Sequence, residues 1–171
     1  MRHVPVPPRR PSPSVRASRE LTFQWEKFSA IAGELPPLFE RHWEEIALDH
    51  AVIPLAPDWD AYYEQELRGI LHVLTARRDT VLVGYIFNLV GGHQHYVSTR
   101  CAHTEMFWLA SRYRRGWGPV KFFLENLKGL KAREAKVATI NFKLHFKGAR
   151  VGKLLARLGY VPTDIVMRKL L

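Results

Sequence analysis

The stretch 107–131, FWLASRYRRGWGPVKFFLENLKGLK, decides the fold of this 171-residue chain. An apolar run ends in a loop that holds three arginines and two glycines, and Pro119 then begins a long amphipathic pattern. Proline suits the first turn of a helix, where its missing N–H is not needed. Apolar residues then recur at helical spacing on one predicted face: Val120, Phe123, Leu124, Leu127 and Leu130. The stretch therefore predicts a strand, a basic glycine loop and a helix.

This arrangement predicts a phosphate site at the start of the helix. The N–H groups of the loop and the positive end of the helix macrodipole point at the same place. Gly116 and Gly118 would let the backbone approach a ligand closely. A phosphorylated coenzyme, a nucleotide or a sugar phosphate would satisfy this pattern equally well.

The flanking sequence predicts a mixed sheet with helices. Asp58 is expected to cap a helix that ends at Gly69, and Gly91-Gly92 is expected to end a strand. Residues 93–104 read as a strand followed by a loop. The expected strands are 21–24, 70–76, 81–90, 105–110, 136–142 and 164–170, and the expected helices are 28–32, one after Pro36-Pro37, one after Asp58, one after Gly118 and 149–158. We predict an α/β (α+β) fold.

Length and composition indicate one globular domain over residues 20–171, preceded by a disordered arm over residues 1–19 that is rich in proline and arginine. No apolar run approaches the length of a membrane-spanning helix, so we expect no membrane association. The single cysteine, Cys101, excludes an internal disulfide and favours a reducing compartment. We expect a cytoplasmic protein.

The net charge of +10 is unevenly distributed. Residues 1–19 carry +5, residues 20–100 carry −6 and residues 101–171 carry +11. An anionic cofactor held by the C-terminal part, with a cationic group approaching the acidic middle, would explain this division. A basic surface that is merely solvated would explain it as well.

These features together resemble the GCN5-related N-acetyltransferases (GNAT). The loop motif of that family is Q/R-x-x-G-x-G/A, and Tyr113-Arg-Arg-Gly-Trp-Gly118 carries both glycines with tyrosine at the first position. The run Leu154-Leu-Ala-Arg-Leu-Gly-Tyr160 is similar to the end of a later helix in the family. The resemblance implies a mostly antiparallel central sheet with helices on both faces. Further motifs, such as His42-Trp-Glu-Glu-Ile46, are similar to small acetyltransferase-like proteins of tailed bacteriophages, which would place the chain in the host cytoplasm or on the virion.

The resemblance also implies acetyl-CoA as the cofactor, with its pyrophosphate on the loop and its pantetheine arm along the preceding strand. The arm would enter where that strand parts from residues 137–141. The residues implied in cofactor binding are Phe107, Trp108, Leu109, Arg112, Arg114, Arg115, Gly116, Trp117, Gly118, Asn141 and His145.

Acetyl transfer to an amine needs a group that removes a proton and a group that protonates the leaving thiolate. Glu105 occupies the strand position where many family members place a base, and His95 and Tyr96 are candidate proton carriers. Leu155 stands where the family has its acidic tyrosine, so Tyr160, His145, Tyr113 or water would have to replace it. Glu44 and Glu45 lie on the helix that lines the acceptor side, and at most one should face the cleft. No cysteine cluster or zinc motif indicates a metal.

We therefore expect an N-acetyltransferase that moves an acetyl group from acetyl-CoA to a primary amine by direct attack. A protein lysine, an N-terminal amine and a small amine are all open as acceptors. The alternative is a non-catalytic binding protein of this fold, with nucleic acid, a virion or a host factor as its partner. The basic arm and the replacement of tyrosine by Leu155 favour that alternative.

Overall fold

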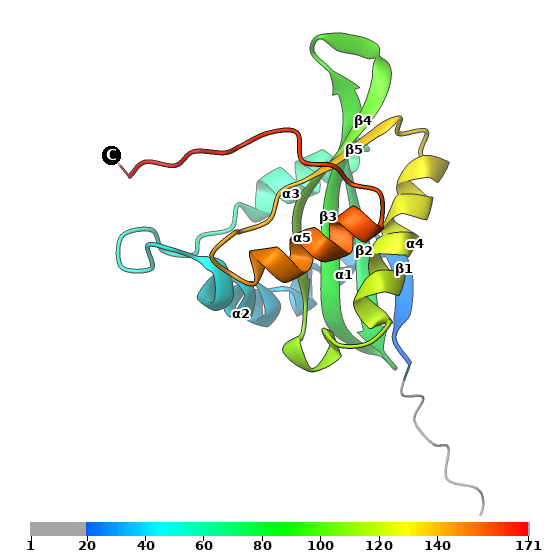
Figure 1. The fold of residues 1–171 in the computed structure, drawn as a ribbon. Helices are drawn as coiled ribbons and strands as arrows, with labels where there is room; N and C mark the ends of the chain where they lie inside the picture. Colours follow the sequence, from blue (N-terminus) through cyan, green and yellow to red (C-terminus); the bar gives the residue numbers. More distant parts are fainter. Residues whose placement is uncertain (1–19, 171) are drawn as a thin grey trace, which may run out of the picture.

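The computed structural model describes residues 20–170, so the arm predicted for residues 1–19 lies outside the described residues. The described residues form five strands and five α-helices around one sheet (Figure 1). The strands are β1 Thr22–Glu26, β2 Leu71–Arg78, β3 Val81–His93, β4 Tyr96–Leu109 and β5 Val137–Ile140. The helices are α1 Phe28–Ile31, α2 Pro36–Ile46, α3 Trp59–Leu67, α4 Gly118–Ala132 and α5 Gly148–Arg157, with short 3-10 helices at Ala32–Glu34 and Ser111–Tyr113.

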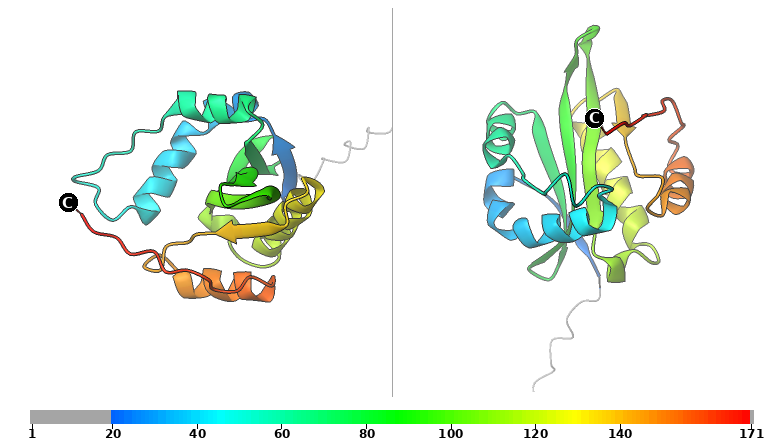
Figure 2. Two further views of the ribbon diagram at one scale, coloured as in Figure 1. Left: turned by 90° about the horizontal axis from the view of Figure 1, so that it is seen from above. Right: turned by 90° about the vertical axis from the view of Figure 1, so that its left-hand side faces the viewer.

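The sheet follows the chain order β1-β2-β3-β4-β5. Neighbouring strands are antiparallel from β1 to β4, and β5 runs parallel to β4 after the crossover through α4. Helices α1 to α3 cover one face, and α4 and α5 cover the other (Figure 2). The prediction of a mixed, mostly antiparallel sheet with helices on both faces is confirmed.

Each face of the sheet has its own apolar core. On the α1–α3 side, aromatic rings from the helices meet rings from β3 and β4, and this core is made by Phe28, Ile31, Leu35, Leu38, Phe39, Leu71, Val73, Leu82, Tyr85, Phe87 and Trp108. On the α4–α5 side, the core is Leu74, Ala76, Val83, Ile86, Leu109, Phe122, Phe123 and Leu155. Successive residues of β4 therefore contribute to opposite cores, as the pleat of a strand requires.

Helix α4 begins where predicted, but its buried face differs from the predicted one. The buried residues are Phe122, Phe123, Asn126, Gly129 and Leu130, and Leu124 is 47% exposed. The sequence pattern was misleading because this face contains an asparagine and a glycine. Asn126 is fully buried and hydrogen-bonds to Asn88 of β3 at 2.9 Å. Gly129 allows the helix to pack directly against the indole of Trp25.

Two strand predictions are wrong. Gly91-Gly92 does not end a strand, because β3 continues to His93 and β4 is one strand of 14 residues. The two form a long hairpin that projects beyond the helices (Figure 1). Residues 164–170 form no strand; they are exposed and cross over the molecule in an extended course. The apolar run Ile165-Val166-Met167 is typical of a strand, but no strand of the described chain pairs with it.

The predicted cap of the third helix is confirmed, since the Asp58 carboxylate accepts a hydrogen bond from the Ala61 N–H at 2.9 Å. Gly69 follows this helix with φ +68°, a conformation that favours glycine. Within residues 20–170, no helix is both long enough and apolar enough to cross a bilayer.

Candidate functional site

The loop between β4 and α4 presents free backbone donors at the start of a helix. Gly116 has φ +70°, and α4 begins at Gly118 with proline in its first turn. Within the described chain, the N–H groups of residues 115–117 donate to no backbone carbonyl. The positive end of the α4 dipole adds to these donors. The loop therefore presents unpaired N–H donors at the start of a helix, and its role as an anion site stays a prediction.

The three arginines of this loop do different things. The Arg114 guanidinium donates to the Glu45 carboxylate of α2 at 2.5 Å and to the Leu109 carbonyl oxygen. Arg112 lies over the Tyr113 ring, 4.9 Å from its centroid. Arg115 is exposed and makes no ion pair with any residue of the described chain. The role of Arg114 in phosphate binding stays a prediction, and in this structure its charge is compensated by Glu45.

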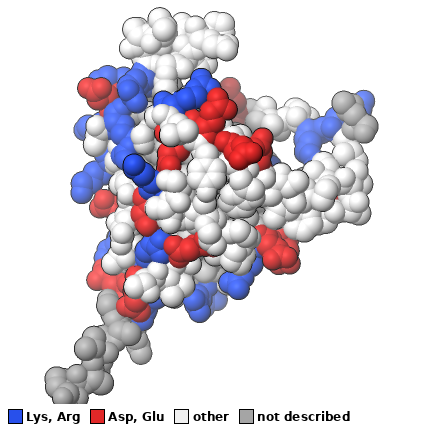
Figure 3. All heavy atoms as spheres, turned by 180° about the vertical axis from the view of Figure 1, so that it is seen from behind, with Lys and Arg blue, Asp and Glu red and all other residues white. Residues whose placement is uncertain are grey.

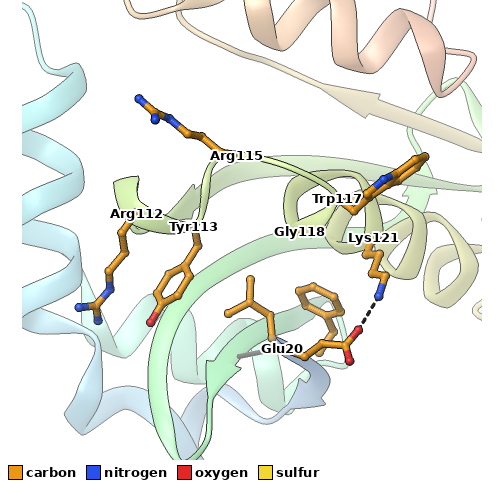
Figure 4. A pocket seen from close by; sticks show the side chains of 9 residues that line it. Glu20, Arg112, Tyr113, Arg115, Trp117, Gly118 and Lys121 are labelled. Carbon is orange, nitrogen blue, oxygen red and sulfur yellow. Dashed lines mark hydrogen bonds and ion pairs between the residues drawn. The ribbon is translucent and has the colours of Figure 1, made fainter. Parts of the chain in front are cut away.

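A groove of about 560 Å³ opens beside the loop (Figure 4). It is lined by Glu20, Leu21, Phe23, Arg112, Tyr113, Arg115, Trp117, Gly118 and Lys121. Lys121 pairs with Glu20 across it at 2.5 Å, and the Trp117 side chain stands 74% exposed at its rim. Arg112 and Arg115 point in opposite directions (Figure 4), so a single bound phosphate would not meet both.

Strand β4 has an unpaired edge that leads to this loop. Its pairing with β5 begins at Cys101 and ends at Thr104, which lies opposite Ile140. On that side, residues 105–109 pair with no strand of the described chain, although residues 106–109 stay paired with β3 on the other side. Apart from the Leu109 carbonyl oxygen, which accepts from Arg114, the peptide groups on this edge have no strand partner and could bond to an extended ligand that carries amides, in the manner of an added strand. This is the parting of strands that the sequence resemblance implied.

The predicted residues of this segment lie on both faces of the sheet. Trp108 is buried in the core on the α1–α3 side, and its indole N–H has no partner. Leu109 is buried on the α4–α5 side, and Phe107 packs there against Phe123 with ring centroids 5.2 Å apart. A ligand along the unpaired edge would use the backbone of these residues rather than their side chains.

Glu105 lies at the point where β4 leaves β5. The register between β3 and β4 shifts there, so Glu105 is the extra residue of a β-bulge. Bulges bend a strand and redirect its side chains, and they recur beside active sites. The Glu105 carboxylate is exposed and lies 3.6 Å from Nε2 of His103. After burial itself, the charge of Glu105 is the next cause that raises the pKa of Tyr62 on α3. The Glu105 carboxylate therefore lies on the α1–α3 side of the sheet.

His95 and Tyr96 are not brought to this point. His95 lies in the turn of the β3–β4 hairpin and Tyr96 begins β4, both exposed at the far tip. At about 3.3 Å per residue, an extended strand places Tyr96 about 30 Å from Glu105. The aromatic and imidazole rings contact one another, with 5.3 Å between the centroids of His93 and Tyr96.

The segment after β5 contacts helix α2. His145 Nε2 lies 3.0 Å from the carbonyl oxygen of Ile46, at the end of α2. Asn141 is exposed directly after β5. Of the two α2 carboxylates predicted to line the acceptor side, Glu45 faces the loop through Arg114, and Glu44 is exposed. Of these two carboxylates, Glu44 is therefore the one left to attract a cationic acceptor, because the charge of Glu45 is compensated by Arg114.

A buried His42–Tyr85 pair was not predicted. His42 Nδ1 lies 2.8 Å from the Tyr85 hydroxyl oxygen. Burial raises the pKa of Tyr85, and burial followed by the charges of Arg114 and Lys143 lowers the pKa of His42 to about 4. Both side chains are thus neutral at pH 7. They join α2 to the centre of the sheet, and no spacing rule in the sequence links positions 43 residues apart.

Leu155 is buried in the core on the α4–α5 side, and its hydrocarbon side chain has no acidic proton to donate. Tyr160 packs against the same core, its hydroxyl is buried without a partner, and burial raises its pKa. His145 is engaged with α2, and Tyr113 lies under Arg112. Of the proposed replacements, Tyr160 is the one that keeps an unshared phenolic proton in an apolar setting.

Within residues 20–170, no group of three or more His, Cys, Asp or Glu side chains is arranged to hold a metal ion.

Seen from behind, lysines and arginines gather along the edge where α4 lies, and acidic side chains lie across the middle of the same view (Figure 3).

Solved structures with the same arrangement of strands and helices are acetyltransferases for the most part. A ribosomal-protein-alanine N-acetyltransferase from Brucella melitensis superposes with a TM-score of 0.68 at 15% identity, over 88% of this chain and 99% of that one. The aminoglycoside N-acetyltransferase AAC(6')-Iy, solved with CoA, superposes with a TM-score of 0.61 at 10% identity, over 88% and 98%. The chain has the GNAT fold.

The same fold also occurs in a structure described as a transcriptional regulator from Bacillus halodurans, with a TM-score of 0.65 at 12% identity over 89% of this chain and 100% of that one. No model of a protein family and no curated protein matches the sequence. The resemblance to bacteriophage proteins therefore stays a prediction.

Proposed function

We propose that the chain is an acetyl-CoA-dependent N-acetyltransferase that acts on a primary amine. The observation that carries the proposal is the unpaired edge of β4 over residues 105–109, which leads directly to a loop with free N–H donors. A ligand that ends in phosphates and continues as an extended chain of amides fits this combination. Coenzyme A has that chemistry, and its presence in the AAC(6')-Iy structure supports the choice.

The roles of the binding residues follow from their positions. The pyrophosphate would be held by the N–H groups of residues 115–117 at the start of α4 and by the exposed Arg115 side chain. The pantetheine arm would pair with the backbone of Phe107–Leu109. Trp117 offers an exposed ring at the rim of the groove, and Asn141 lies exposed where the arm would pass between β5 and the loop.

The chemistry needs no covalent enzyme intermediate. The amine attacks the thioester carbonyl carbon, the C–S bond breaks, and the thiolate takes up a proton. Glu105, at the bulge where the two strands part, lies at the inner end of the unpaired edge. There a carboxylate would help remove the amine proton. We assign the proton donor to the thiolate to Tyr160, because its buried hydroxyl has no hydrogen-bond partner in the described chain.

The acceptor is a primary amine: a protein N-terminus, a lysine or a small amine such as an aminoglycoside. The two acetyltransferases above act on an alanine of a ribosomal protein and on aminoglycosides, so the fold is compatible with either class.

Isothermal titration calorimetry of the full chain with acetyl-CoA tests the proposal. We expect saturable binding and an increase in melting temperature, because a ligand that binds only the folded state stabilises it. Cleavage of the thioester after addition of an amine would establish catalysis. An absence of binding at millimolar acetyl-CoA would overturn the cofactor assignment.

A non-catalytic binding protein is the second candidate, favoured by the charge of +11 on residues 101–171 and by the regulator of the same fold. Such a protein would bind nucleic acid with a steep dependence on salt concentration. Fluorescence anisotropy with a DNA or RNA oligonucleotide at several salt concentrations distinguishes the two. Tight binding that deletion of residues 1–19 abolishes, without any binding of acetyl-CoA, would favour the second candidate.

A further inference from the structure

His103 lies beside Glu105 at the point where β4 and β5 part. Its Nδ1 atom is 2.9 Å from the Thr139 hydroxyl of β5, and its Nε2 atom is 3.6 Å from the Glu105 carboxylate. The His103 side chain is 35% exposed and that of Glu105 is 54% exposed, so both are open to solvent. A histidine, a carboxylate and an orienting hydroxyl thus come together at the inner end of the unpaired edge.

The hydrogen bonds around Thr139 determine which nitrogen of His103 is free. The Thr139 hydroxyl donates its single hydrogen to the carbonyl oxygen of Ala102, at 3.4 Å. With that hydrogen engaged, the hydroxyl can accept from Nδ1 of His103, and the proposed base is the tautomer whose hydrogen is on Nδ1. The lone pair is then on Nε2, on the side of the ring that faces Glu105. This is the arrangement of a base whose orientation is fixed by one neighbour and whose protonated form is stabilised by another.

The register of the strands places this nitrogen near the expected reaction. His103 lies opposite Thr139, one residue before the last pair between β4 and β5. A ligand that follows the unpaired edge inward from the loop must stop there, because β5 occupies the edge beyond. Thr104 turns toward Asn88 on the α4 side, so His103 turns to the opposite face, where Glu105 acts on Tyr62.

We propose that His103 is the general base of the reaction and that Thr139 and Glu105 are its positioning residues. This inference rests on the proposed acetyltransferase function. His103 Nε2 takes a proton from the acceptor ammonium, and the resulting amine forms the new C–N bond. The C–S bond breaks with its electron pair on sulfur, and the thiolate takes a proton from the Tyr160 hydroxyl, which regains the second proton lost by the nitrogen. The imidazolium, paired with Glu105, then returns its proton to water.

The test compares variants of the full chain in acetyl transfer to three probes: kanamycin, a peptide with an N-terminal alanine and a lysine-containing peptide. With whichever probe the wild type uses, we expect His103→Gln to lower kcat about 100-fold, the scale of general base catalysis. Its dissociation constant for acetyl-CoA by calorimetry should stay within about twofold, since the phosphate loop is untouched. Thr139→Val should lower kcat by about tenfold. Thr22→Val, which removes a similar exposed hydroxyl from β1, is the matched control and should leave kcat unchanged.

A second nucleophile separates a base from a merely structural residue. Hydroxylamine is unprotonated at neutral pH and needs no base to become nucleophilic, so His103→Gln should acetylate hydroxylamine at close to the wild-type rate. Equal losses with hydroxylamine and with the amine probe would overturn the role of His103, as would a variant that keeps more than a third of wild-type kcat. Either result would leave the acetyltransferase function intact. Transfer to none of the three probes, or no binding of acetyl-CoA, would overturn both proposals.

Discussion

Gly116 allows the phosphate loop to be tested against a matched position elsewhere in the chain. Gly116 has φ +70° and Gly69, after α3, has φ +68°. A Cβ atom built at either position meets no protein atom within 4 Å. Alanine at each site therefore introduces the same backbone strain and no collision. The two variants differ only in what surrounds them, which is the phosphate loop in one case and a helix end in the other.

The expected loss of stability is similar for both variants. Left-handed backbone costs a residue with a Cβ about 1–2 kcal/mol. Replacing glycine also restricts the unfolded chain, which returns about 0.4–1 kcal/mol. We expect Gly116→Ala and Gly69→Ala each to lower the free energy of unfolding by about 1 kcal/mol, measured by urea denaturation.

Their effects on cofactor binding should differ. Strain at Gly116 is relieved by rotating the peptide groups of residues 115–117, which turns free N–H donors away from the ligand. One hydrogen bond to a charged group is worth about 1.5–3 kcal/mol, so affinity for acetyl-CoA should fall by about 10- to 100-fold. Gly116→Asp, which adds a negative charge, should weaken binding further. Calorimetry on both alanine variants makes the comparison, and equal dissociation constants for Gly116→Ala and Gly69→Ala would refute the assignment of this loop.

Three further predictions concern the fold that holds the site. Burial lowers the pKa of His42 from 6.5 to about 4, so the unfolded chain takes up its proton first as the pH falls. Stability should therefore drop between pH 6.5 and 4 by up to about 3 kcal/mol, and urea unfolding of His42→Gln should show a shallower drop; an unchanged slope would exclude His42 as the source. Gly129→Ala drives a methyl group into the Trp25 indole and should cost about 1–3 kcal/mol in thermal denaturation, whereas a neutral result would mean that helix α4 sits further from the sheet. Asn126→Ala leaves the buried Asn88 amide without its partner and should cost about 1–3 kcal/mol, measured by chemical denaturation, with full stability counting against the network.

The local part of the fold could be predicted from the sequence because its signals lie within a few residues of one another. The stretch 107–131 contains its own strand end, glycines, proline and helical pattern, and the structure has a loop and a helix there. The Asp58 cap and the Gly69 turn are equally local. In each case the residue type satisfies a backbone requirement of its immediate neighbours.

The long hairpin could not be predicted because it projects away from the core. Tyr96 and Val97 at the start of β4 are 64% and 88% exposed, so this end of the strand has no apolar alternation to reveal it. The reverse occurs at residues 164–170, which contain an apolar run but have no partner strand in the described chain. Hydrophobic pattern reports burial, and it reports a strand only where burial and pairing coincide.

His103 was missed for a different reason. Its sequence neighbours give no sign of a partner, and the residue that fixes its orientation, Thr139, lies 36 positions later on another strand. Glu105 was predicted from its position on β4 alone. His103 is recognised only from the pairing of β4 with β5, which brings it opposite Thr139. A site made at the junction of two strands becomes visible only when their register is known.

The three arginines of the loop show how much the fold adds to a charge pattern. In the sequence, Arg112, Arg114 and Arg115 are equivalent cations beside a glycine motif. In the structure, Arg114 forms an ion pair with Glu45 and contacts the Trp108 and Phe146 rings. Its side chain therefore joins the loop before α4 to helix α2. Half-buried pairs of this kind are costly to break, because removing one partner leaves a charge without compensation. In the proposed complex, the loop is held in place by an arginine that is unavailable to the phosphates, and phosphate binding is left to the backbone donors and Arg115. Counting the lysines and arginines of this loop would overstate the positive charge available to a ligand. Most of the proposed donors are the unpaired backbone N–H groups, which a count of charged residues does not include.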